Sequence, residues 1–173
     1  MSTTVAAPSI AAEVAIFSRQ SQMAQGTVRR NTSDLTHDES VRQPDPGGNC
    51  LNWVVGHLVW VYDMVLPALG QQPVLGDRMP AGYHRHSNDR LDCAQSLPFA
   101  ELLAGFEQAA TRFQAGLASA TPELLDAPAP VSPSNNPKET VRSLLVSISF
   151  HQAYHAGQTG LLRRLAGKEG AIR

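Results

Sequence analysis

Residues 136–167, NPKETVRSLLVSISFHQAYHAGQTGLLRRLAG, decide the expected fold. Apolar residues recur in this stretch at every third or fourth position, which predicts a long amphipathic helix. Asn136 is the expected N-cap, with Pro137 and Glu139 in the first turn. Gly167 suits the position just after the last turn. The apolar stripe expected to face the core consists of Val141, Leu144, Leu145, Ile148, Leu161, Leu162 and Leu165.

Two histidines interrupt this apolar stripe. Steps of three and four from Ile148 lead to His151 and His155, and then to Gln158. Because His151 and His155 are four residues apart, their rings project from the same side of adjacent turns. Burying two imidazoles costs free energy unless their nitrogens find partners, and one metal ion can serve both. The pair therefore predicts a metal site inside the protein.

Three further segments are also predicted to be helical, at about 9–30, 49–69 and 98–120. The second is apolar on most sides and ends at Gly70, with Asn49 as a plausible N-cap. Segments rich in Gly and Pro separate the helices, and no alternation typical of strands occurs. The sequence thus predicts an all-α protein, a four-helix bundle with a long crossover between its second and third helices. We expect a flexible tail at 1–8, the bundle at 9–167 and a second tail at 168–173.

A third histidine, His57, lies on the buried row of Val54, Leu58 and Val61 in the second helix. Three mid-helix core histidines form a plausible set of ligands for one ion. The alternative is that each histidine is an ordinary core residue whose nitrogens are hydrogen-bonded within the protein. We expect His57, His151 and His155 to bind metal together.

Composition excludes several classes of function. The chain has 173 residues, 17% of them charged, and a formal net charge of −1, so nothing attracts it to nucleic acid or to an anionic membrane surface. Charged and polar residues within 51–69 favour a buried helix over a membrane span. Two cysteines imply no disulfide framework, and no secretory signal is visible. A cytoplasmic location is the expectation.

Two motifs resemble those of DinB-like (YfiT-like) proteins. Residues 49–58, NCLNWVVGHL, are similar to the motif N-x-x-x-W-x-x-G-H-L, and residues 151–158, HQAYHAGQ, to H-x-x-x-H-x-G-Q. The resemblance implies a four-helix bundle, often a homodimer, with a divalent metal on His57, His151 and His155 and water at the remaining positions. It implies a metal-dependent hydrolase, or a transferase or isomerase that uses a low-molecular-weight thiol.

The predicted site does not choose between these chemistries. Three neutral histidines leave coordination positions open, so a bound ion can activate water or hold a thiolate. Imidazole ligands suit zinc, nickel or iron, and the expected partner is a small-molecule substrate. No Glu lies between His151 and His155, which disfavours a protease of the His-Glu-x-x-His type. A non-catalytic metal-binding protein that acts in stress or interaction, and a structural bundle without metal, remain alternatives.

Several other residues have two interpretations each. Gln158 can orient a ligand from outside the coordination shell, or be a buried amide bonded to the backbone. His84 and His86 can lie over the metal from the long connection, although solvated loop residues are the favoured interpretation. Arg85 and Arg90 are candidate partners for the carboxylates of a thiol cofactor. Gly157 is expected to allow close helix packing, and Trp53 and Trp60 are expected to anchor the core or an interface rather than to contact substrate.

Overall fold

The computed structural model describes residues 9–85 and 91–172 and confirms the all-α class. Within those residues, the regular structure is helical and one isolated bridge joins Pro128 to Thr140. Residues 1–8, expected to form a tail, lie outside the described part, as do His86 and Arg90. The α-helices are α1 (Ile10–Thr32), α2 (His37–Ser40), α3 (Leu51–Val65), α4 (Phe99–Ala118), α5 (Pro122–Asp126) and α6 (Val141–Leu165).

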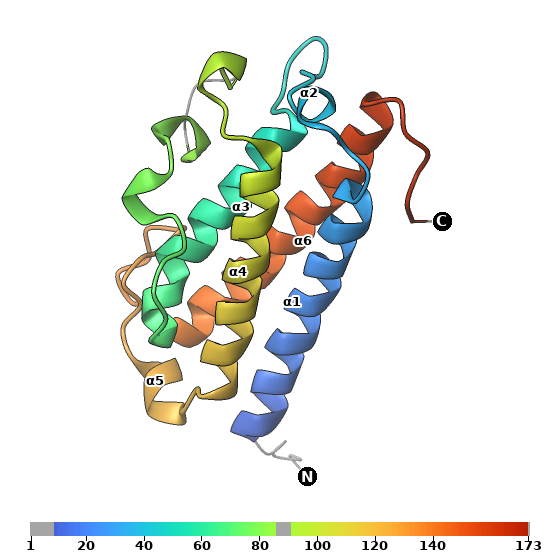
Figure 1. Cartoon of the computed structure of the whole chain (residues 1–173). Helices are drawn as coiled ribbons and strands as arrows, with labels where there is room; N and C mark the ends of the chain where they lie inside the picture. Colours follow the sequence, from blue (N-terminus) through green and yellow to red (C-terminus); the bar gives the residue numbers. More distant parts are fainter. Residues whose placement is uncertain (1–8, 86–90, 173) are drawn as a thin grey trace.

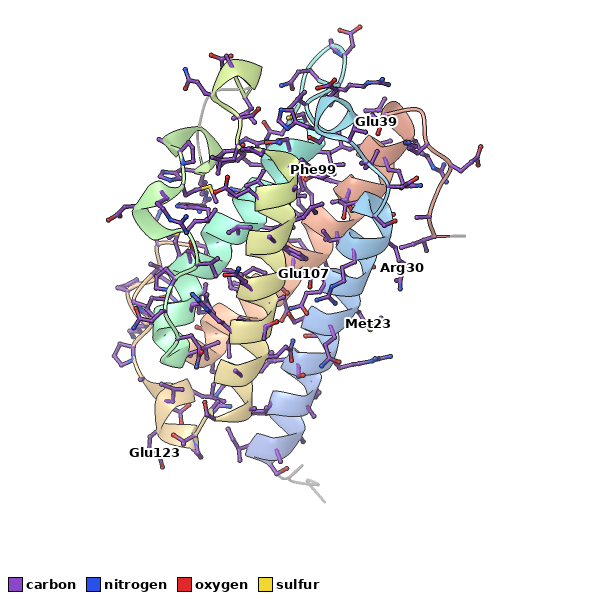
Figure 2. The ribbon with its side chains drawn as sticks, in the orientation of Figure 1. Met23, Arg30, Glu39, Phe99, Glu107 and Glu123 are labelled. Atoms are coloured by element: carbon purple, nitrogen blue, oxygen red, sulfur yellow. The ribbon has the colours of Figure 1, made fainter. Side chains whose placement is uncertain are left out.

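The four long helices, α1, α3, α4 and α6, lie side by side, and the connection between α3 and α4 returns along the outside (Figure 1). This return makes α3 and α4 run in the same direction, opposite to α1 and α6 (Figure 1). Contacts far apart in the chain agree with these directions. Arg142 near the start of α6 contacts Glu13 near the start of α1, and Asn31 near the end of α1 bonds Thr159 of α6. Glu107 lies on α4 on the side toward α1, where Arg29 pairs with it (Figure 2).

The predicted helix boundaries are largely correct, but two N-caps are wrong. Helix α3 begins after Cys50 instead of Asn49, and Cys50 makes no side-chain cap bond. Helix α6 begins at Val141 instead of near Asn136: Thr140 is the N-cap, in a capping box with Ser143. The 3-10 turn η1 (Leu66–Leu69) extends α3 to Gly70, whose φ of 69° is left-handed. The predicted loops at 31–48 and 121–136 contain the short helices α2 and α5.

The connection from α3 to α4 is held by hydrogen bonds to buried polar side chains. It contains the 3-10 turns η2 (Gly76–Arg78), η3 (Ala81–Tyr83) and η4 (Cys93–Gln95). The carboxylate of Asp63 on α3 accepts hydrogen bonds from the backbone N–H groups of residues 74–76. The Tyr83 hydroxyl donates to the Asn52 amide oxygen at 2.6 Å and accepts from the backbone N–H of Leu97 at 2.8 Å. The connection is therefore fixed to α3 at both ends.

Gly56, and not Gly157, allows a close approach within the chain. A Cβ on Gly56 of α3 would lie 2.3 Å from the nearest atom of the Tyr83 ring, whereas a Cβ on Gly157 would meet nothing within 4 Å. The prediction for Gly157 is therefore wrong within the chain, because this residue is exposed on the outer face of α6. Leu161 and Leu165, expected in the core, are also on this face and are 63% and 49% exposed.

No helix in the described part of the chain combines the length and apolar character needed to cross a bilayer. The cytoplasmic location expected from the sequence stays a prediction.

Candidate metal centre

Three imidazoles from two helices meet in the interior. The Nε2 atom of His151 lies 3.2 Å from Nε2 of His57 and 3.1 Å from Nε2 of His155. His57 comes from α3, and the other two come from adjacent turns of α6. His57 and His155 are buried, and His151 is partly buried. All three are therefore positioned so that they could hold one metal ion through Nε2, as their spacing predicts.

The other ring nitrogens fix how two of the histidines are protonated. Nδ1 of His57 lies 2.8 Å from the carbonyl oxygen of Tyr83, and Nδ1 of His155 lies 2.7 Å from Oε1 of Gln158. Both oxygens accept hydrogen bonds, so each Nδ1 carries the proton and each Nε2 presents a lone pair. This is the tautomer that a metal-binding histidine needs, and it is held by partners outside the coordination shell.

The three nitrogens fit a cation better than they fit one another. Nε2 of His151 faces two lone pairs, those on Nε2 of His57 and Nε2 of His155. A neutral His151 has a single N–H, so a hydrogen bond could satisfy only one of them. Nδ1 of His151 is buried and makes no hydrogen bond within the described part of the chain. A cation at the centre would accept all three lone pairs together. The arrangement therefore fits the donor set of a divalent metal ion.

Burial keeps the cluster neutral. Burial lowers the pKa of His57 to about 4 and that of His151 to about 3, and it also lowers the pKa of His155. Burial is the largest cause of these pKa shifts, and the neighbouring imidazoles and the charge of Arg85 contribute smaller parts of the shifts of His57 and His151. Metal binding requires unprotonated nitrogen, so these shifts extend the pH range in which the cluster can bind a cation.

We predict acid sensitivity of the metal-free protein from these shifts. An unfolded histidine binds a proton near pH 6.5, whereas folded His57 does so only near pH 4. Each such histidine therefore contributes fully to the free energy of unfolding above pH 6.5. As the pH drops toward 4, this contribution should fall by at most about 1.4 kcal/mol per pH unit. Urea denaturation at pH 7, 6 and 5 measures this slope. A His57→Leu variant should show a shallower slope, and an equal slope would contradict the prediction.

Aromatic rings surround His57. The Trp53 ring stacks on His57 with centroids 4.4 Å apart, and Nε1 of Trp53 donates to the Gly82 carbonyl at 2.8 Å. Trp60 packs on the other side, 5.3 Å from His57, and stacks on His84 at 5.0 Å. His84 therefore lies near the histidine cluster, because it stacks on Trp60 and Trp60 packs against His57. This position differs from the solvated loop position favoured by the sequence.

Gln158 bonds two side chains, His155 and Tyr154, as an orienting residue would. Its Oε1 accepts from His155, and its Nε2 donates to the Tyr154 hydroxyl at 3.3 Å, which turns the oxygen toward the imidazole. We predict that Gln158→Ala weakens metal binding about 10- to 100-fold, as loss of such partners does elsewhere. Gln158→Glu keeps an acceptor and should retain most of the affinity. Competition with a chelating dye measures both variants, and equal losses would argue against an orienting role.

A cavity of about 640 Å³ opens beside His57 and His151. All but two residues of α3 are buried, and those two, Trp60 and Met64, line this cavity. Its other walls come from α6, from residues 131–134 and from Arg85 in the connection. Trp60 thus lines a cavity and is only partly buried, whereas the sequence-based expectation was an anchor in the core or in an interface. The site combines possible metal ligands with an adjacent, mostly apolar pocket, which is the usual form of a small-molecule site.

Comparison with known proteins agrees with this geometry. Residues 8–159 match the family model described as the DinB superfamily. No curated protein matches the chain. A crystal structure of a conserved protein from Enterococcus faecalis superimposes with a TM-score of 0.68 over 88% of this chain and 96% of that one. At 18% identity, this likeness shows a common fold. The family match spans most of the chain, which therefore belongs to the DinB superfamily.

Proposed function

We propose that this protein is a metal-dependent hydrolase built on a four-helix bundle, with one divalent cation held by His57, His151 and His155. The observation that carries the proposal is the convergence of three Nε2 atoms at the wall of an open cavity. Imidazole ligands suit zinc, nickel or iron. Three protein ligands leave coordination positions for a small molecule, as catalytic sites do and closed structural sites do not.

The protein's own residues would perform distinct tasks around such a cation. When bound, a divalent cation would act as a Lewis acid that polarises a carbonyl and makes water or a thiol more nucleophilic near neutral pH. Tyr83 and Gln158 hold the ring nitrogens that face away from the centre. Trp53 and Trp60 pack against the His57 ring and would hold it in place. Trp60 and Met64 offer apolar surface to a substrate.

A thiol-dependent transferase or isomerase is the second candidate. Within the described part of the chain, the residues lining the cavity include no carboxylate that could serve as a general base for water, and they include one arginine, Arg85. A thiolate nucleophile needs no such base, and an arginine suits the carboxylates of a low-molecular-weight thiol. This composition of the cavity supports the transferase.

Metal analysis of the protein purified without a histidine tag tests the central claim. We expect about one equivalent of a divalent metal per chain and little in a His155→Ala variant. Equal metal in both would end the assignment. Ester and amide hydrolysis assays, with and without added thiol, then separate the two enzyme classes: turnover that needs thiol identifies the transferase. Metal without any turnover would favour the non-catalytic binding protein.

We also propose that the chain forms a homodimer through the outer face of α6. An apolar stripe runs along this face, and its large side chains are between 49% and 75% exposed. Exposed Gly157 lies within the stripe, where a second helix can approach closely. Such a stripe suits a two-fold interface in which the same surface serves both copies. The stripe consists of Val146, Phe150, Tyr154, Leu161 and Leu165.

The dimer is tested by the mass in solution. We expect light scattering to give twice the mass of one chain, and Leu161→Glu to give monomers, because it places a charge within an apolar contact. Ala115→Glu, on the exposed face of α4, is the matched control and should stay dimeric. A monomeric parent protein would refute the proposal.

A further inference from the structure

The cavity beside the histidines has apolar walls. A ligand that fills it must therefore present mostly hydrocarbon or aromatic surface. Two of the wall residues, Trp60 and Met64, come from the partly exposed positions of α3, and two, Ile148 and Phe150, come from α6. The remaining apolar lining consists of Val61, Val65, Val131, Pro133, Leu144 and Val146.

Among the residues that the structure describes, the cavity lining includes one charged side chain, Arg85, and no Asp or Glu. The three histidines are neutral, so they would leave the charge of a bound divalent cation uncompensated. The charge of Arg85, together with that of a bound cation, would raise the local potential at the apolar wall, although Arg85 is exposed and water screens part of its effect. The cavity therefore favours an anion over a neutral or cationic molecule of similar shape.

Arg85 is placed to bind that anion. One of its terminal nitrogens donates to the Pro133 carbonyl at 2.7 Å, which uses one of five N–H donors. No ion pair joins Arg85 to a carboxylate within the part of the chain that the structure describes. Arg85 lines the same cavity as His57 and His151, so a ligand held by its guanidinium lies in the cavity beside the histidines. A guanidinium binds a carboxylate through two parallel hydrogen bonds.

We propose that the cavity binds small amphipathic carboxylates. Arg85 holds the carboxylate, and the apolar body lies against Trp60 and the aliphatic wall, which brings the rest of the molecule to the histidines. The proposal that these carboxylates are substrates rests on the proposed function, whereas the proposal that they bind does not. Binding itself depends on Arg85 and on the apolar wall.

Three matched probes test the proposal: 3-phenylpropionate, its neutral amide and the corresponding cationic amine. Quenching of tryptophan fluorescence and calorimetry measure the dissociation constants for the metal-loaded and the metal-free protein. We expect the carboxylate to bind roughly tenfold or more tightly than the amide, because charge-assisted hydrogen bonds are the strong ones. The amine should bind most weakly. Arg85→Gln should remove the preference, and Arg85→Lys should keep part of it.

Arg78→Gln is the matched control, because Arg78 is exposed in the same connection and is not among the residues lining the cavity. This variant should keep the parent's preference. Equal binding of carboxylate and amide by the parent would overturn the proposal, and so would a preference that persists in Arg85→Gln. The metal content of each variant is measured separately. A chain that binds no metal but loses its carboxylate preference in Arg85→Gln would refute the proposed function and support this one.

Discussion

Saturating metal-free protein with a divalent cation should raise its melting temperature by roughly 10 °C, and at the same cation concentration His151→Ala should lose about two thirds of this response or more. A ligand that binds only the folded state stabilises that state by about 4 kcal/mol when the free ligand concentration is a thousand times the dissociation constant. For a chain of this size, each kcal/mol corresponds to roughly 2–4 °C. We expect metal affinity to fall at least a hundredfold in the variant, because loss of an orienting partner alone costs about 10- to 100-fold. Scanning calorimetry across a metal titration measures both quantities.

His151 is the most informative ligand to remove. Its Nδ1 makes no hydrogen bond in the described part of the chain, so the substitution disturbs no orienting contact. His84→Ala is the matched control: this histidine stacks on Trp60 near the centre but is not one of the three converging residues. The control should keep the full response to metal. A response of the same size in His151→Ala would show that the stabilising cation binds elsewhere.

The site was predictable from the sequence where helix geometry alone determines it. His151 and His155 share one helix, so a spacing of four fixes their relation before any tertiary structure exists. The approach of His57 depends on how α3 packs against α6, and the two sequence motifs supplied that expectation. The contact between His57 and the Tyr83 carbonyl was not predictable. Every residue has a backbone oxygen, so the residue type at position 83, 26 residues from His57, does not indicate this contact.

The start of α6 shows how tertiary contacts override a local signal. Asn136, Pro137 and Glu139 have the order expected at a helix N-terminus. The backbone at 139–141 instead pairs with residues 127–129: Ala129 donates to the Glu139 carbonyl, and Val141 donates to the Ala127 carbonyl. A segment bonded in this way cannot also begin the helix. The N-cap is therefore Thr140, four residues after the predicted Asn136.

The outer face of α6 shows a different limit. Periodicity identifies an apolar stripe, but it does not identify what covers that stripe. Leu144 and Ile148 face the core of this chain, whereas Leu161 and Leu165 continue the apolar pattern onto the outside. The proposed dimer would bury this second face, which would explain why the stripe is wider than one core requires.

Gly56→Ala should damage the metal centre although residue 56 is not a ligand. The new Cβ would lie 2.3–2.4 Å from two carbons of the Tyr83 ring, which is fully buried and hydrogen-bonded to Asn52 and Leu97. Because the hydroxyl of this ring is hydrogen-bonded and the ring is buried, we expect the clash to displace residue 83, whose carbonyl is the partner of His57 Nδ1. Overpacking of this kind costs about 1–3 kcal/mol, against a gain in helix propensity of about 1 kcal/mol.

We therefore expect Gly56→Ala to lower the free energy of unfolding by up to about 2 kcal/mol and to weaken metal binding about tenfold or more. Gly26→Ala on α1 is the matched control, since its Cβ would meet only the end of the Arg30 side chain at 3.8 Å. The control should gain stability from helix propensity and bind metal like the parent. Urea denaturation and chelator competition distinguish the two variants. Unchanged metal affinity in a destabilised Gly56→Ala protein would show that the contact between Tyr83 and His57 does not orient the ligand, and would leave that carbonyl a purely structural role.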